Sequence, residues 1–233
     1  MKVAVLQFPG SNCDLDALKA LRSIKVPTDL IWHREFKGGD YDGVIIPGGF
    51  AYGDYLRAGA ISAHTPAIEE VKEMAAEGKP IGGICNGFQI LIEAGLLPGA
   101  LIENSSMKFV CKWVIVKVET DRTPFTRLLR RGQLMRMPVA HHQGNYFCKN
   151  LKELYENDQI VFRYVDERAL PTESANPNGA IDNVAGVCNP EGNVVGLMPH
   201  PERASNAILS PSGTADGEIF FKSMFDYMGG RSW

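Results

Sequence analysis

Apolar residues in the first half of the chain alternate between short strand-like runs and stretches with helical spacing. The strand-like runs, which are rich in valine, isoleucine and leucine, lie at residues 3–6, 30–32, 44–46 and 80–84. Helical spacing follows at residues 15–24, 65–78 and 88–94. Because strands that alternate with helices along a chain usually pair in parallel, the pattern predicts an open α/β sheet that binds ligands at the carboxyl ends of its strands.

Strands dominate the second half of the chain. Strand-like runs lie at 109–118, 133–140, 160–165, 184–187 and 194–197. The first three are expected to extend or flank the main sheet, and the last two surround a turn and predict a hairpin. Apolar residues with helical spacing at 219–228 predict a final helix. The sequence contains neither an internal repeat nor a linker, so residues 1–233 are expected to form a single domain.

Composition and charge narrow the classes of function. The chain has 233 residues, of which 45% are hydrophobic and 22% charged, and its formal net charge is −3. This balance is typical of a globular protein and argues against nucleic acid as a partner. No apolar run approaches the roughly 20 residues that span a bilayer, and the first residues lack the pattern of a signal peptide. We therefore expect a cytoplasmic protein without a membrane partner.

The five cysteines are an odd number without C-x-x-C spacing, so neither a disulfide framework nor a zinc ribbon is indicated. No His-x-x-x-His pair or Cys/His cluster occurs along the sequence, which argues against a metal site. Four cysteines are interpreted as packing residues, namely Cys13, Cys111, Cys148 and Cys188. The fifth, Cys85, has more specialised surroundings.

Cys85 lies between a predicted strand and a predicted helix and is flanked by Gly83 and Gly87. This G-x-C-x-G spacing is the thiol counterpart of the hydrolase nucleophile elbow, in which the amide after the nucleophile faces the developing oxyanion. Here that residue is Asn86. The positive end of the following helix favours the thiolate, the form that attacks. The pentapeptide alone leaves a buried structural cysteine open as the alternative.

A cysteine nucleophile needs a base, and the base needs a partner that orients it. His200 follows a predicted strand, and Glu202 lies two residues later in an extended segment, on the same side and within reach of the imidazole. His141 and His142 also follow a strand but have no carboxylate nearby. Gly49, in a glycine pair that ends another strand, is a second candidate oxyanion donor, although a tight turn explains the pair equally well.

Three segments together resemble class I glutamine amidotransferase domains, namely residues 83–89 (GICNGFQ), 47–50 (PGGF) and 198–203 (MPHPER). Residues 8–13 (FPGSNC), residues 52–59 (YGDYLRAG) and the CNGFQ form more closely resemble the glutaminase subunits of phosphoribosylformylglycinamidine synthases, which act in de novo purine synthesis. The resemblance covers nearly the whole chain. It implies a flavodoxin-like open mixed sheet, mostly parallel, with helices on both faces.

The resemblance implies thioester chemistry on glutamine. Cys85 attacks the side-chain amide of the substrate, while His200 moves protons and Glu202 orients the imidazole. Ammonia leaves first. Water then hydrolyses a γ-glutamyl thioester on Cys85 to glutamate, in the two steps that covalent catalysis allows.

The same resemblance implies further contacts and a partner chain. The amides of Gly49 and Asn86 hold the tetrahedral oxyanion, and Gln89 contacts the substrate one helical turn beyond the nucleophile. The sequence contains no G-x-x-x-x-G-K-[ST] phosphate loop, so the ATP-dependent half of the reaction is assigned elsewhere. We expect a large synthetase subunit that carries ATP and Mg²⁺, a small accessory subunit in some lineages, and no cofactor on this chain. The loop at 52–63 is a candidate contact for the synthetase.

Several alternatives remain at this point. Residues 141–144 read HHQG where the family has His-Gly-Glu-Gly, and we hypothesise that this loop tunes the partner interface. A thiol hydrolase or peptidase on the same fold, or an amidotransferase subunit for another acceptor, is a second possibility. A hydrolase of another γ-glutamyl substrate would keep Cys85 and His200 without needing the pattern at 52–59. A non-catalytic binding module would retain the elbow merely as a turn.

Overall fold

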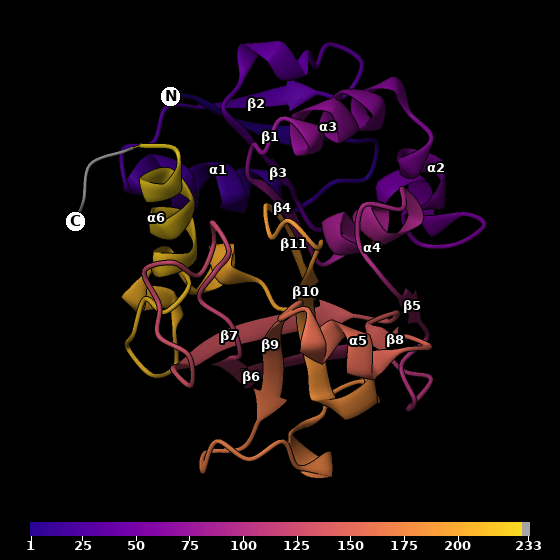
Figure 1. Ribbon diagram of the computed structural model, residues 1–233, viewed down its shortest axis with the longest axis vertical. Helices are drawn as coiled ribbons and strands as arrows, with labels where there is room; N and C mark the ends of the chain where they lie inside the picture. Colours follow the sequence, from indigo (N-terminus) through magenta and orange to yellow (C-terminus); the bar gives the residue numbers. More distant parts are fainter. Residues whose placement is uncertain (230–233) are drawn as a thin grey trace.

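A nine-stranded mixed sheet forms the centre of the protein (Figure 1). Its strands are β1 (Val3–Gln7), β2 (Thr28–Trp32), β3 (Gly43–Ile46), β4 (Ile81–Ile84), β6 (Val110–Val118), β7 (Leu134–His141), β9 (Ile160–Val165), β10 (Val184–Cys188) and β11 (Val194–Leu197). The computed structural model describes residues 1–229, so residues 230–233 of the expected single domain lie outside the described range. The sheet confirms the predicted α/β fold class.

Helices cover both faces of the parallel part of the sheet. They are α1 (Asp14–Ser23), α2 (Ala60–Ala63), α3 (Pro66–Ala76), α4 (Asn86–Glu93) and α6 (Glu218–Tyr227), whereas α5 (Leu151–Glu156) precedes β9 and lies beside the antiparallel part (Figure 1). Figure 1 shows α1 and α6 on one side of these strands and α2, α3 and α4 on the other. Two short strands, β5 (Ala100–Ile102) and β8 (Asn145–Phe147), form a separate antiparallel pair.

The order of strands is β2-β1-β3-β4-β11-β10-β9-β6-β7. The first five strands run parallel, and β11 joins β4 in the register that pairs Leu197 with Ile84. The remaining strands pair antiparallel, starting with the predicted hairpin of β10 and β11. Parallel pairing brings the carboxyl ends of β1, β3, β4 and β11 to one edge. The loops that carry the candidate site residues therefore start side by side.

Close packing around the central strand β4 fixes the position of the helix that follows it. Ile81 and Ile84 are fully buried, and the strand has glycine at the two positions between them. A Cβ atom on Gly82 would lie 2.8 Å from Ile45 Cδ1, and one on Gly83 would lie 2.5 Å from Leu91 Cδ1. Small residues therefore let β3 and α4 approach β4 closely.

Four short elements have no clear signal in the sequence pattern. They are α2, α5, β5 and β8, each of three to six residues. Such lengths hold less than two turns or a single strand pairing, so periodicity cannot distinguish them from loops. Among residues 1–229, no helix has the length and apolar character needed to cross a bilayer.

Candidate active site

Cys85 sits at a strained turn between β4 and α4. Its backbone has φ 52° and ψ −104°, a conformation that costs energy for any residue other than glycine. The amide of Cys85 donates a hydrogen bond to the carbonyl of Leu197 on β11, at 2.8 Å. Helix α4 begins at the next residue, so its first amides lie beside the sulfur. The predicted strand-to-helix elbow is therefore present in the structure.

The glycines that flank Cys85 are required by packing. A Cβ atom on Gly87 would lie 1.9 Å from the carbonyl oxygen of Ile46, and one on Gly83 would lie 2.7 Å from the carbonyl oxygen of Gly87. Both contacts involve backbone atoms, which cannot rotate away. The G-x-C-x-G spacing thus reflects how tightly the turn is packed against β3.

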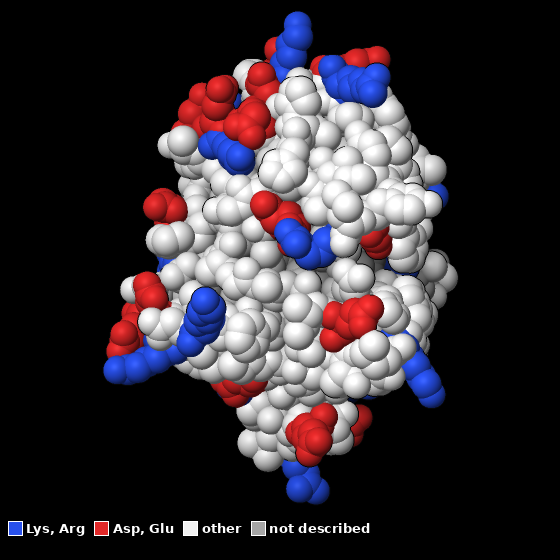
Figure 2. Space-filling model, turned by 90° about the vertical axis from the view of Figure 1, so that its right-hand side faces the viewer, with Lys and Arg blue, Asp and Glu red and all other residues white. Residues whose placement is uncertain are grey.

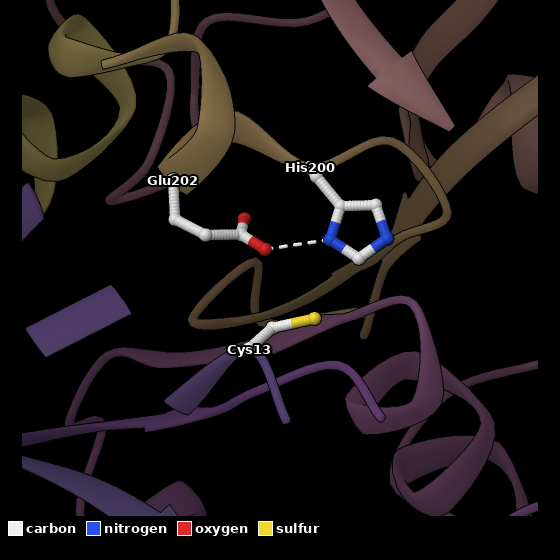
Figure 3. Close-up of side chains that lie close together, drawn as sticks. All are labelled: Cys13, His200 and Glu202. Carbon is white, nitrogen blue, oxygen red and sulfur yellow. Dashed lines mark hydrogen bonds and ion pairs between the residues drawn. The ribbon is translucent and has the colours of Figure 1, made fainter. Parts of the chain in front are cut away.

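His200 and Glu202 form a buried pair at the end of β11 (Figure 3). The Nδ1 atom of His200 lies 2.6 Å from Oε1 of Glu202, as the sequence predicted. The route to this contact differs from the prediction. Glu202 is reached through a short 3₁₀ helix, Pro201–Ala204, and not through an extended segment. Pro201 at the first helical position suits this turn because its φ is already fixed near the helical value.

The environment of His200 favours the imidazolium form. Burial by itself lowers the pKa of His200, but the Glu202 carboxylate, Cys85 and Cys13 raise this pKa well above its usual value. In the described part of the chain, Nε2 of His200 has no hydrogen-bond partner. A charged ring with one unpaired nitrogen can donate a proton to a leaving group in the adjoining cavity.

Hydrogen bonds join the segments that carry Gly49 and Asn86, the two candidate oxyanion donors. Gly49 has φ 150°, and a Cβ atom there would lie 2.7 Å from the carbonyl oxygen of Gly10. No hydrogen bond from the Gly49 amide is found among residues 1–229. The Asn86 side chain accepts a hydrogen bond from the Ala51 amide at 3.0 Å and donates one to Asp54 at 3.2 Å. These bonds attach the loop after β3 to the elbow.

A cavity of about 200 Å³ opens beside the sulfur. It is lined by Gly49, Phe50, Asp54, Cys85, Gln89, Ala140, His141, His142 and Gln143. The Gln89 side chain donates a hydrogen bond to the Gln143 carbonyl at 2.7 Å and accepts one from Asn86 at 2.8 Å. The predicted substrate contact at Gln89 therefore lies in the same cavity as the predicted nucleophile.

His141 is a structural residue of this cavity wall. Its ring lies between Asn104 and Asn178, with ring-to-amide distances of 3.2 and 3.4 Å. Burial, together with the charge of His200, lowers the pKa of His141 to about 4. His141 is consequently neutral near neutral pH and has no carboxylate partner. Of the two competing histidines, His142 is only partly buried and also lines the cavity.

Cys13, interpreted from the sequence as a packing residue, lies beside His200 (Figure 3). Its sulfur accepts a hydrogen bond from Nη2 of Arg203 at 3.1 Å. A Cβ atom on Gly48 would lie 3.1 Å from this sulfur, 2.8 Å from Cε1 of His200 and 3.4 Å from Cβ of Cys85. The sequence did offer one indication that Cys13 lies at the site. Residues 8–13 follow β1, and the carboxyl end of β1 lies at the same edge of the sheet as the elbow.

The chain is similar to glutamine amidotransferases of known family over almost its whole length. A family model described as a CobB/CobQ-like glutamine amidotransferase domain matches residues 1–228. A Methanosarcina acetivorans protein described as phosphoribosylformylglycinamidine synthase subunit PurQ is 53% identical over 231 residues, which cover 98% of each chain. Its Pyrococcus horikoshii counterpart is 51% identical, covering 98% of this chain and 99% of the relative. A solved structure described as PurLQS from Thermotoga maritima has a TM-score of 0.85 and 44% identity, covering 97% of this chain and 98% of that one. The chain therefore belongs to the CobB/CobQ-like glutamine amidotransferase family.

Proposed function

We propose that this chain is the glutaminase subunit of a phosphoribosylformylglycinamidine synthase. It hydrolyses glutamine to glutamate and ammonia, and the ammonia serves the ATP-dependent conversion of formylglycinamide ribonucleotide to formylglycinamidine ribonucleotide. One observation carries the proposal: Cys85, at a strained elbow, lines a cavity of about 150 Å³ together with His200, which Glu202 holds from behind. The full-length similarity to subunits of this name supports the choice of acceptor.

In the first step, the Cys85 thiolate attacks the side-chain carbonyl carbon of glutamine. The carbonyl oxygen becomes an oxyanion, and the amides of Gly49 and Asn86 donate hydrogen bonds to it. The imidazolium of His200 gives its proton to the departing nitrogen, so that ammonia leaves and a γ-glutamyl thioester remains. Gln89 lines the cavity of about 200 Å³ and contacts the substrate there.

In the second step, water replaces ammonia. His200, now neutral, takes a proton from the water as its oxygen attacks the thioester carbon. The same two amides stabilise the second oxyanion, and glutamate leaves as the Cys85 thiolate is restored. Glu202 keeps Nδ1 of His200 hydrogen-bonded throughout, which orients Nε2 toward the reacting atoms.

The proposed partner is a large synthetase subunit that binds ATP and Mg²⁺, with a small accessory subunit in some lineages. The proposal includes a cytoplasmic location and a single domain over residues 1–233.

On the face that carries α2 and α4, charged side chains are scattered among broad uncharged areas (Figure 2). On the candidate contact loop at 52–63, the Tyr55 and Leu56 side chains are 75% and 92% exposed. Such apolar exposure suits a protein partner.

We also propose that the loop at 141–144 tunes the interface with the synthetase. The Gln143 carbonyl accepts the Gln89 hydrogen bond, and His142 lines the substrate cavity. Replacing His142 by Gly and Gln143 by Glu restores the family pattern. We expect this double variant to change the yield of transferred ammonia per glutamine hydrolysed. An unchanged yield in the assembled enzyme would count against the idea.

The test compares two ammonia sources in the assembled enzyme. Cys85→Ser removes the nucleophile, so glutamine-dependent synthesis is expected to fall at least about 10³-fold. Synthesis driven by added ammonium salt bypasses this chain and is expected to continue. Cys111→Ser, which alters an exposed thiol, is the matched control and should leave both rates intact. Glutamine-dependent synthesis that survives in Cys85→Ser would refute the proposal. No observation favours peptide hydrolysis.

A further inference from the structure

The cavity beside the Cys85 sulfur contains a carboxylate that has no cation near it. Asp54 lies in the loop at 52–63 and, with Cys85 and Gln89, lines the cavity of about 200 Å³. The other titratable side chains of this lining are the Cys85 thiol and two histidines, of which His141 is neutral near neutral pH. Asp54 is therefore the one acidic side chain among the described residues that line this cavity.

The charge of Asp54 is not balanced within the chain. Burial raises the pKa of Asp54, whereas a hydrogen bond from Asn86 lowers it. Among residues 1–229, no charged side chain alters this pKa, and Asp54 forms no ion pair. The Cys85 thiolate, by contrast, has the His200 imidazolium beside it. Because a partly buried carboxylate without a cation costs free energy, a cation that enters this cavity would bind favourably at Asp54.

One carboxylate oxygen of Asp54 is held in place, and the other is free to bind. Nδ2 of Asn86 donates a hydrogen bond to Oδ1 of Asp54 at 3.2 Å and another to Oε1 of Gln89 at 2.8 Å. Within the described range, Oδ2 of Asp54 accepts no hydrogen bond, and this oxygen is not fully enclosed by the protein. The Asn86 bond therefore positions the side chain and leaves Oδ2 to accept a hydrogen bond from a ligand.

The backbone that carries Asp54 is held in a conformation that most residues avoid. Tyr52, Gly53 and Asp54 are consecutive residues with φ of 53°, 69° and 54°, all in the left-handed region. Such strain persists only where the surrounding structure holds it, and it is common at ligand sites. The Tyr52 amide donates a hydrogen bond to the Pro9 carbonyl at 2.6 Å, and Asn86 holds the Asp54 side chain. The carboxylate is thus presented to the cavity from a fixed loop.

Glutamine carries the group that this carboxylate lacks. Its side-chain amide must reach the Cys85 sulfur, and its only cation, the α-ammonium group, lies at the opposite end of the molecule. Because Cys85 and Asp54 line the same cavity, one glutamine molecule can contact both of them. An ammonium group and a carboxylate form charge-assisted hydrogen bonds, which are stronger than neutral ones.

We propose that Asp54 binds the α-ammonium group of glutamine and thereby selects an α-amino acid over amides that lack this group. The inference rests on the proposed glutaminase function and specifies how the substrate is recognised. An amide without the α-ammonium group leaves Asp54 unpaired, and a site built to bind a polar group strongly rejects analogues that lack it. If Asp54 instead only held Asn86, or paired with a cation of the synthetase, its loss would affect every amide substrate equally.

The test compares glutamine with glutaramate, in which hydrogen replaces the α-amino group, as substrates of the assembled enzyme. Ammonia release measures hydrolysis of both compounds. Asp54→Asn keeps the size of the side chain and an oxygen that can accept the Asn86 hydrogen bond, but it removes the charge. We expect kcat/KM for glutamine to fall about 10- to 100-fold, whereas kcat/KM for glutaramate should stay within about twofold of wild type.

Two further variants and a binding measurement complete the design. Asp121→Asn is the matched control, since Asp121 is an exposed acid outside the cavity and its loss should leave both values intact. Asp54→Glu keeps the charge and is expected to retain the preference for glutamine. If wild type hydrolyses glutaramate too slowly to measure, the inhibition constant of glutaramate against glutamine hydrolysis replaces its kcat/KM. This constant should be the same in wild type and Asp54→Asn.

The outcomes separate this inference from the proposed function. Circular dichroism and ammonium-dependent synthesis establish that Asp54→Asn folds and assembles. Equal losses for glutamine and glutaramate in this variant, or an Asp54→Glu enzyme without preference for glutamine, would overturn the role of Asp54 while glutamine hydrolysis by wild type still stands. An assembled wild-type enzyme that hydrolyses no glutamine would refute the proposed function, and this inference with it.

Discussion

At the scale of single residues, the chemistry of the site depends on the charge of a fully buried histidine. His200 keeps an imidazolium because Glu202 and the neighbouring thiols outweigh the cost of burial. His141, whose pKa the charge of His200 helps to lower, has only amide partners and stays neutral. The two histidines show how neighbours, and not burial alone, decide protonation.

Replacing Glu202 by Gln removes the carboxylate that raises the pKa of His200. The pKa of His200 should fall. A smaller fraction of the ring is then protonated, and less acid is present to donate a proton to the departing nitrogen. We expect kcat for glutamine hydrolysis to fall roughly 10²-fold or more. Histidine NMR titration measures the pKa, and a glutaminase assay measures kcat. Glu69→Gln, on the exposed surface of α3, is the control. An unchanged pKa in Glu202→Gln would contradict the account.

His141 makes stability depend on pH. Its folded pKa is about 4 against an ordinary value of 6.5, so the unfolded chain takes up a proton in this window before the folded one does. The stability it contributes is complete above pH 6.5 and is lost as the pH falls toward 4, by up to about 3 kcal/mol. Urea unfolding of His141→Asn across this range should show a shallower loss than wild type. Parallel curves would mean that His141 does not titrate in this way.

The sequence allowed most individual site residues to be proposed, but not Cys13. Cys85, His200 and Glu202 lie in short sequence motifs, and the residues next to them indicate their roles. Cys13 gains its significance only from the order of the parallel strands, in which β1 pairs with β3, β3 with β4 and β4 with β11, so that the loops after β1 and β11 meet. Likewise, the turn that joins His200 to Glu202 is a 3₁₀ helix, because Pro201 favours a helical φ that a strand-based expectation ignores.

At the scale of elements, the elbow works because β4, α4 and β3 are packed without room for side chains between them. Gly83 and Gly87 provide this close approach, and Cys85 takes the strained backbone conformation. The long predicted elements all occur in the structure, with ends that shift by a few residues. The short elements α2 and α5 were not predicted, because less than two turns of helix give no readable periodicity.

Gly87→Ala tests the packing of the elbow. Its Cβ would lie 1.9 Å from a backbone carbonyl, and neither atom can move without shifting β3 or α4. We expect a loss of about 2 kcal/mol or more in unfolding free energy, together with reduced glutamine hydrolysis. Gly39→Ala is the control, because its Cβ meets nothing within 4 Å. Equal stabilities of the two variants in urea unfolding would refute the packing argument.

At the scale of the whole molecule, the parallel half of the sheet collects four loops at one edge, and the antiparallel half closes the site from the other side. The pattern predicted the parallel half well, since each strand is followed by a helix. It did not predict that β11 pairs with β4, because more than a hundred residues separate them and periodicity carries no information on partners. Full-length similarity to a structure described as PurLQS confirms the fold and the resemblance to an assembly subunit.

The loop at 52–63 gives a prediction about that assembly. Leu56 is 92% exposed, and Asp54 in the same loop is hydrogen-bonded to Asn86 at the elbow. Leu56→Asp should weaken association with the synthetase about tenfold or more, because it places a charge where apolar contact is expected. Ile208→Asp, at a 90% exposed position outside the loop, is the matched control. Equal co-purification of both variants with the synthetase would remove the loop from the interface.

The most direct test of the central claim is covalent labelling of the assembled enzyme with diazo-oxo-norleucine, an electrophile that mimics glutamine. Five thiols are present, and two of them, Cys85 and Cys13, lie beside His200. Peptide mass mapping should find one label per chain, on Cys85, with loss of glutamine-dependent synthesis and retention of ammonium-dependent synthesis. A label on Cys13 or elsewhere, or inactivation without modification of Cys85, would contradict the assignment of the nucleophile.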